Sequence, residues 1–106
     1  MNALPRYIYK AMIMDYQKGV IHLTIDLGFN TLSRQWVMLD RVSPYIKARD
    51  YIAKHHIGQL VYVKTLKRAE DDNSVWCVEL YDYRTKESIN NKLLALRLAE
   101  PFGVKR

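Results

Sequence analysis

The amino-acid sequence predicts a mainly β protein with two helices, and three observations lead to this fold class. The chain has 106 residues, of which 49% are hydrophobic and 26% charged, so its size and balance are those of a single globular domain, residues 1–106. Five segments have the alternation, or the β-branched and aromatic composition, that is typical of strands. Helical spacing of apolar residues occurs in two segments, one near the middle of the chain and one close to its C-terminus.

The first three predicted strands lie in the N-terminal part of the chain. Ile21, Leu23 and Ile25 alternate with polar residues, which predicts a strand with one buried face. A glycine-containing turn at 16–19 joins this strand to the preceding one as a hairpin. A second, polar turn is expected at 30–33. The three strands are predicted at residues 7–14, 21–27 and 35–39.

A change of periodicity after the third strand predicts a helix. Ser43 can cap this helix, and Pro44 favours its first turn. Gly58 marks its C-terminal end. The residues that recur at helical spacing are Tyr45, Ala48, Ile52 and His56.

The C-terminal part of the sequence predicts two more strands and a second helix. The strands are expected at 60–66 and 75–81, with an acidic turn at 70–73 between them. Another turn at 84–87 leads into the helix, for which Ser88 can serve as the N-cap. The apolar stripe of this helix comprises Ile89, Leu93 and Leu96.

The order of three strands, a helix, two strands and a closing C-terminal helix is that of a five-stranded OB-fold barrel, with the first helix between strands 3 and 4. Barrels of this type bind oligonucleotides or oligosaccharides on one face and its loops. The 17 Lys and Arg outnumber the 11 Asp and Glu, and the formal charge of +6 favours an anionic partner such as nucleic acid. We expect four helix residues to pack against the barrel: Ala48, Ile52, Leu93 and Leu96.

The composition excludes several other classes of protein. Cys77 is the only cysteine, which excludes a disulfide scaffold and a cysteine-rich zinc site. No apolar run has the length of a membrane span, and no apolar signal core stands near the N-terminus. We therefore expect a cytoplasmic protein with no membrane partner, no cofactor and no bound metal. The pair His55–His56 is interpreted as a partly charged helix end, Asp71–Asp72 as a solvated turn and Cys77 as a small core residue.

Four short segments carry the motifs of one known family. They are Ile25-Asp26-Leu27-Gly28-Phe29, Ser43-Pro44, Val75-Trp76-Cys77-Val78-Glu79-Leu80-Tyr81, and Asn90-Asn91-Lys92-Leu93-Leu94 followed by Leu98-Ala99-Glu100-Pro101-Phe102. In order, these resemble the family's Asp-Leu-Gly-Phe segment, the Thr-Pro that opens its first helix, the strand after its Tyr-Gly-Arg, and its Asn-x-x-Leu-Val…Gly-Leu-Ala-x-x-Tyr tail. The chain is thus similar to the staphylococcal-nuclease-like, or thermonuclease-like, family over residues 7–102.

The resemblance implies a site for phosphodiester cleavage with one calcium ion. The family's site places two aspartates and a backbone carbonyl on the metal, a glutamate beside the attacking water and two arginines on the phosphate. A catalytically degenerate member is nevertheless expected, because other residue types occupy the corresponding positions here: Gly19, Val37, Val42, Tyr45 and Val75. Asp40 and Arg34 are the residues that could replace a metal ligand and a phosphate-binding arginine. The small size and the lost site suggest a protein of a phage or mobile element.

Aromatic and basic residues gather in two segments. OB domains hold single strands by stacking bases on exposed rings beside Lys and Arg, and this chain contains eight Tyr and two Trp. Tyr62 and Lys64 share one face of the predicted fourth strand, and a second group that includes Tyr83 follows the fifth strand. The candidate nucleic-acid-binding residues are Arg34, Tyr62, Lys64, Lys67, Arg68, Tyr81, Arg84 and Lys86.

Three functions agree with these observations. The first is a non-catalytic nucleic-acid-binding module. The second is a protein-interaction module, because tyrosine and tryptophan also form hot spots between proteins. For a phage protein, the partner in that case would be a host nucleic-acid enzyme or defence system in the host cytoplasm. The third is an active divalent-dependent nuclease, which would require Asp40 or Arg34 to restore the site. The sequence leaves open DNA or RNA, strandedness and oligomeric state, and we take the first function as the working hypothesis.

Overall fold

The computed structural model describes residues 8–69 and 72–101, with side chains described outside 66–74. The chain forms seven strands and two helices within these ranges. Their bounds are β1 Ile8–Gln17, β2 Val20–Gly28, β3 Thr31–Leu39, β4 Val42–Pro44, α1 Ile46–His55, β5 Leu60–Ala69, β6 Asp72–Asp82, α2 Ile89–Ala95 and β7 Ala99–Pro101. No helix in the described ranges has the length and apolar composition that crossing a membrane requires.

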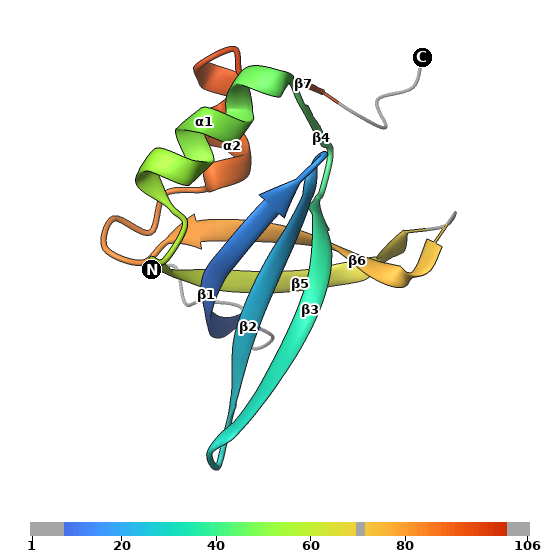
Figure 1. The fold of residues 1–106 in the computed structure, drawn as a ribbon, viewed down its shortest axis with the longest axis vertical. Coiled ribbons are helices and arrows are strands. Elements are labelled where there is room, and N and C mark those ends of the chain that lie inside the picture. Colours follow the sequence, from blue (N-terminus) through green and yellow to red (C-terminus); the bar gives the residue numbers. More distant parts are fainter. Residues whose placement is uncertain (1–7, 70–71, 102–106) are drawn as a thin grey trace, which may run out of the picture.

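Five of the strands close into a barrel in the order β1-β2-β3-β6-β5 (Figure 1). β1, β2 and β3 form an antiparallel meander, and β5 and β6 form a second hairpin. Antiparallel pairing of β1 with β5 and a short parallel pairing of β3 with β6 join the two units. With α1 between the third and fourth barrel strands, this is the predicted OB-like barrel.

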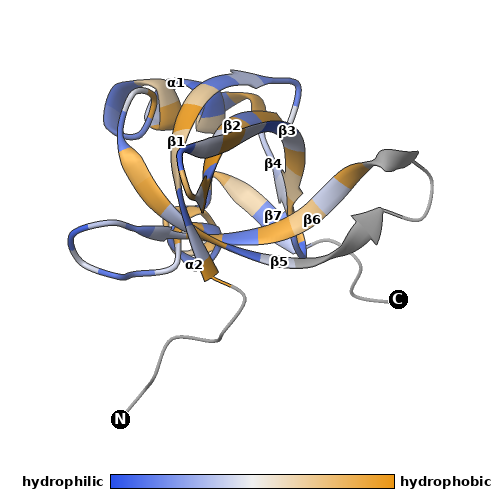
Figure 2. Ribbon diagram, turned by 90° about the horizontal axis from the view of Figure 1, so that it is seen from below, coloured by the Kyte–Doolittle hydropathy of each residue, from blue (hydrophilic) through white to orange (hydrophobic). Residues whose placement is uncertain are grey.

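The barrel core consists of the alternate residues of each strand. Ile21, Leu23 and Ile25 of β2 are buried, as their spacing predicts, and Val78 and Leu80 of β6 are buried as well. Figure 2 shows this alternation as hydrophobic and hydrophilic bands along β6. The residues between them, such as Glu79 on β6 and Tyr62 on β5, are less buried and face outward.

Both helices pack on the barrel, but one predicted contact is wrong. Ala48 and Ile52 of α1 are buried, and so is Leu93 of α2. Leu96, however, is 45% exposed, because α2 ends at Ala95 and the chain turns there toward β7. Leu98 packs against the core beyond the turn instead.

The turns of the N-terminal meander are tighter than predicted. Lys18 and Gly19 alone form the first turn, with φ angles of 51° and 83°. Phe29 and Asn30 form the second, with φ angles of 54° and 60°, so β3 begins at Thr31 and the expected polar turn at 30–33 is wrong. Two residues with positive φ are sufficient to reverse a hairpin whose strands twist in the right-handed sense. The resulting β2–β3 hairpin extends away from the helices (Figure 1).

The structure adds a small sheet that the sequence did not predict. β4 and β7 pair antiparallel, with Val42 opposite Pro101 and Pro44 opposite Ala99. Each strand has only three residues and ends in proline, so neither carries an alternation pattern. The pairing fixes the segment after α2 beside the segment that enters α1.

Candidate functional site

Two tyrosines and two lysines form a compact group on the outer surface of the barrel. The rings of Tyr62 and Tyr83 are stacked, with centroids 5.2 Å apart and an interplanar angle of 23°. Lys86 Nζ lies 5.3 Å from the Tyr62 centroid and 5.7 Å from that of Tyr83. Lys10 Nζ lies 5.7 Å from the Tyr83 centroid. We call Lys10, Tyr62, Tyr83 and Lys86 the tyrosine–lysine cluster.

Strand register brings two members of the cluster together. Tyr62 stands on β5 between the buried residues Val61 and Val63, so its side chain faces outward. Opposite it are Lys10 on β1 and Tyr81 on β6. Because β1 and β5 close the barrel, residues more than 50 positions apart in sequence become neighbours.

A tight turn supplies the other two members. One carboxylate oxygen of Asp82, Oδ1, accepts hydrogen bonds from the backbone N–H groups of Arg84 (2.8 Å) and Thr85 (2.9 Å). These bonds lower the pKa of Asp82 and fix the turn. Lys86 then adopts a φ of 67°, and its Nζ donates to the backbone oxygen of Tyr83 at 2.9 Å. The ammonium group is therefore held against the rings by a hydrogen bond.

Tyr81 is fixed beside the cluster. Its hydroxyl donates to Glu79 Oε1 at 2.9 Å, and Ser88 Oγ donates to Glu79 Oε2 at 2.8 Å. Burial and the hydrogen bond to Glu79 raise the pKa of Tyr81 to about 12. Lys64 stands opposite Glu79 across β5 and β6, so this margin of the surface carries both signs of charge.

The remaining predicted binding residues are dispersed. Arg34 is exposed on β3 opposite Thr24, away from the cluster. The side chains of Lys67 and Arg68 lie outside the described residues. Lys10 was not among the predicted binding residues. The sequence does carry a signal for it, because Lys10 is a charged residue within a mostly apolar strand, but only the pairing of β1 with β5 shows which residues it faces. The structure thus brings together Tyr62, Tyr81, Tyr83, Arg84 and Lys86 with the unpredicted Lys10.

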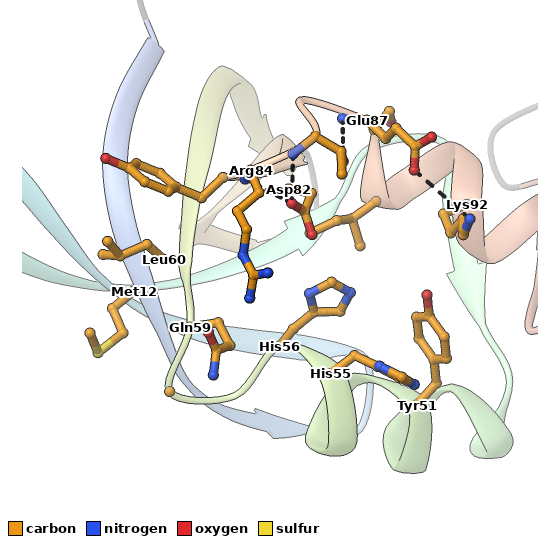
Figure 3. Close-up of a pocket in the computed structure, with 15 residues that line it drawn as sticks. Met12, Tyr51, His55, His56, Gln59, Leu60, Asp82, Arg84, Glu87 and Lys92 are labelled. Carbon is orange, nitrogen blue, oxygen red and sulfur yellow. Dashed lines mark hydrogen bonds and ion pairs between the residues drawn. The ribbon is translucent and has the colours of Figure 1, made fainter.

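A groove adjoins the cluster, between the C-terminal end of α1 and the loop from β6 to α2 (Figure 3). Its volume is about 670 Å³, and Tyr83 belongs both to its lining and to the stacked pair. We call it the Asp82 groove. The charged and ring-bearing residues that line it include Tyr51, His55, His56, Asp82, Tyr83 and Arg84.

The two histidines at the end of α1 have different environments, which corrects their interpretation as one partly charged helix end. His55 is exposed and packs on Tyr51, with ring centroids 4.6 Å apart. His56 is only 6% exposed, and its Nε2 has no hydrogen-bond partner among the described residues. Burial lowers the pKa of His56, although the nearby Asp82 carboxylate opposes this effect. The imidazole of His56 is therefore neutral at pH 7.

Three of the five positions at which the sequence resemblance implies a degenerate nuclease site are apolar and buried, whereas Tyr45 among the other two is 46% exposed. Val37, Val42 and Val75 are at most 8% exposed. Val42 lines a second cavity of about 560 Å³ together with Gly19 and Tyr45. Within the part of the chain that the structure describes, no three His, Cys, Asp or Glu side chains gather as they would around a metal ion.

The sequence analysis also singled out Asp40, Cys77 and Asp71. The Asp40 carboxylate lies 3.7 Å from Arg41 Nε. Cys77 is half-buried on β6 and does not belong to the buried core. Asp71 lies outside the described residues, so the expected acidic turn is not described.

The chemical capacity of this surface follows from its parts. Stacked rings have flat apolar faces, and the ammonium groups of Lys10 and Lys86 over the rings add positive charge to this surface. The adjoining groove presents a carboxylate and a guanidinium within reach of the same rings.

Neither models of known protein families nor curated proteins match the sequence.

Proposed function

We propose that the protein is a non-catalytic module that binds single-stranded nucleic acid through the tyrosine–lysine cluster. The observation that carries the proposal is the stacked pair of Tyr62 and Tyr83 with Lys86 and Lys10 over the rings. A single strand has unpaired bases that can stack on such rings, and its phosphates pair with ammonium groups. Base–aromatic stacking contributes about 1–3 kcal/mol per base.

Charge supports the same partner. The formal charge of +6 attracts a polyanion, and in the cluster Lys10 and Lys86 form no ion pair with another described residue. Their charges are therefore free to neutralise phosphates, which releases condensed counterions and favours binding at low salt.

The non-catalytic part of the proposal rests on the resemblance to the staphylococcal-nuclease-like family. The OB-like order of the barrel is what that resemblance implies. The positions where the family holds metal ligands and arginines carry Val37, Val42 and Val75, whose side chains are buried among apolar neighbours. A charged side chain at these buried positions would lose its hydration, which costs free energy. The valines avoid this cost and stabilise the fold, but they cannot bind a metal ion or a phosphate.

Fluorescence anisotropy with a labelled thymidine oligonucleotide tests the proposal. The parent protein should bind at about 50 mM salt, and Tyr62→Ala should weaken binding about tenfold through the loss of stacking. Tyr45→Ala is the matched control, because Tyr45 is an exposed tyrosine that lines the second cavity and not the cluster. Absence of binding by the parent protein, or equal loss in both variants, would contradict the proposal.

The β2–β3 hairpin favours a second candidate function, a protein-interaction module. Phe29 at its turn is 101% exposed, Leu32 is 65% exposed and Leu27 is 46% exposed. Exposed apolar residues gathered on one projecting element are typical of protein-binding surfaces. If the protein is phage-encoded, a host protein is the expected partner.

A pull-down from host lysate with and without nuclease treatment separates the two functions. Capture that survives nuclease and disappears in Phe29→Ser supports the protein-interaction module. Capture that nuclease abolishes supports the nucleic-acid-binding module.

A further inference from the structure

The Asp82 groove continues the surface of the tyrosine–lysine cluster. Tyr83 both lines the groove and stacks on Tyr62, so the groove and the stacked pair share one residue. The volume of about 670 Å³ exceeds that of one nucleobase.

Two opposite charges face this groove without neutralising each other. The Asp82 carboxylate uses Oδ1 for the turn and also receives a hydrogen bond from the Thr85 side chain, while its negative charge forms no salt bridge with a residue in the described ranges. Arg84 forms no ion pair with any residue in the described ranges. Figure 3 shows the side chains of Asp82, Arg84 and His56 directed toward the same space. The other charged pair of the groove, Glu87 and Lys92, is already joined at 3.8 Å.

A third polar group points to a missing partner. His56 is nine-tenths buried, lines the groove and leaves its Nε2 without a hydrogen-bond partner among the described residues. Unpaired buried polar atoms are uncommon in folded proteins, because each costs the free energy of its lost hydration. The flat rings of His55 and Tyr51 stand beside it, so the groove combines planar walls with a donor and an acceptor, while His56 Nε2 itself is covered by the protein.

We propose that the Asp82 groove binds one guanine base of the strand held on the tyrosine–lysine cluster. Guanine carries two acceptors, O6 and N7, on one edge, and two donors, N1–H and the N2 amino group, on the adjacent edge. Arg84 donates to the acceptors, and Asp82 Oδ2 accepts from the donors. Thymine lacks the paired donors, and adenine lacks the O6 acceptor. This inference rests on the proposed nucleic-acid binding and adds to it a base preference.

The first test compares oligonucleotides with the unaltered protein. A thymidine strand of about eight nucleotides is compared with the same strand carrying one central deoxyguanosine, deoxyadenosine or deoxyinosine. We expect the single deoxyguanosine to tighten binding about tenfold, within the range of one good bidentate base contact. Deoxyinosine, which lacks the N2 amino group, should lose a part of this gain, and deoxyadenosine should show none.

The second test uses variants that leave the cluster intact. Arg84→Gln and Asp82→Asn should each abolish the gain from deoxyguanosine, so that each variant binds the strand with the deoxyguanosine no more tightly than the all-thymidine strand. The asparagine retains an oxygen that can accept the turn hydrogen bonds, so the turn should persist. Lys86→Gln is the contrasting variant and should weaken all strands alike, since ammonium–phosphate contacts carry no base preference. Lys47→Gln, on the exposed face of α1, should change nothing.

The outcomes separate this inference from the proposed function. Binding of the all-thymidine strand with no preference for deoxyguanosine overturns the guanine site and leaves the nucleic-acid-binding module standing. The same holds if Arg84→Gln weakens every strand equally, because Arg84 would then contact phosphate. If the unaltered protein binds none of the strands, the proposed function fails and the guanine site fails with it.

Discussion

Burial keeps the imidazole of His56 uncharged, and this gives the protein a pH-dependent stability. The pKa of His56 lies below its ordinary value of 6.5, because the surroundings of the ring penalise the cation. Asp82 facing it opposes this penalty, His55 adds to it, and Tyr51 contacts the ring edge-on at 5.7 Å. The unfolded chain therefore binds a proton at a higher pH than the folded one, and stability falls as the pH drops below about 6.5.

We expect the melting temperature to decrease between about pH 7 and pH 5, and His56→Gln to lose most of this dependence. Asp82 has a lowered pKa, so its contribution to the free energy of unfolding is retained until the pH approaches the ordinary carboxyl value of 3.8. This lies well below the range between pH 7 and pH 5. His55→Gln is the control, because His55 is exposed. Thermal melts at several pH values check the prediction, and an unchanged pH dependence in His56→Gln would show that another group is responsible.

If the resemblance to the nuclease family holds, the residues at the corresponding positions predict an inactive protein. We expect no cleavage of DNA or RNA with calcium or magnesium, because Val37, Val42 and Val75 supply neither metal ligands nor phosphate donors. Removal of a single charge-stabilising donor can reduce an enzyme's rate by about 10²–10³. The measurement is a gel assay with fluorescent substrates. Calcium-dependent cleavage that co-purifies with the protein and disappears in Asp40→Ala would overturn the expectation.

At the scale of the element, Leu93 is one of the three buried residues that fix α2 to the barrel. Leu93 is fully buried, so Leu93→Ala should reduce the free energy of unfolding by about 2–5 kcal/mol. Leu96 on the same helix end is 45% exposed, and Leu96→Ala should change stability by less than about 0.5 kcal/mol. Denaturant unfolding of both variants measures the two losses in the free energy of unfolding. Equal losses would mean that the helix packs differently.

A buried asparagine supplies a second link between α2 and the barrel. Asn90 accepts a hydrogen bond from Leu80 N at 3.1 Å and donates to the backbone oxygens of Asp40 at 3.1 Å and Val78 at 3.2 Å. Asn90→Ala leaves these backbone groups without their partner and should cost about 1–3 kcal/mol. Asn91→Ala, at the exposed neighbouring position, is the control. Denaturant midpoints distinguish the two, and an Asn90→Ala midpoint equal to the control contradicts this role.

Elements with a clear periodicity were predictable, and those without one were not. The alternation of Ile21, Leu23 and Ile25 and the helical spacing of Ala48 and Ile52 each reflect a buried face. β4 and β7 have no such pattern, because their pairing depends on α2 returning the chain to the entrance of α1. The early start of β3 was missed because Leu32, which belongs to the strand, is exposed.

At the scale of the whole molecule, binding should depend steeply on salt. If Lys10 and Lys86 neutralise phosphates, the logarithm of the affinity falls linearly with the logarithm of the salt concentration, and their double replacement by Ala should flatten that slope by roughly two. Anisotropy titrations at several salt concentrations measure both slopes. An unaltered slope in the variant would mean that these lysines do not contact phosphate.

The candidate site was only partly predictable, since its members come from distant parts of the chain. Composition and spacing indicated Tyr62, Tyr83 and Lys86, which lie in segments rich in aromatic and basic residues. Lys10 joins them through the β1–β5 pairing, and the Asp82 groove forms between α1 and a loop nearly 30 residues later. Such contacts are a property of the closed barrel, and local sequence patterns do not encode them.

The closure of the barrel also determines when the chain can fold during its synthesis. β1 must wait for β5, and β4 obtains its partner β7 only with residues 99–101. A nascent chain that has emerged as far as α1 carries the β1–β2–β3 meander with two unpaired edges and an uncovered apolar face. The unpaired edges and the apolar face make this intermediate prone to association until the second hairpin is made.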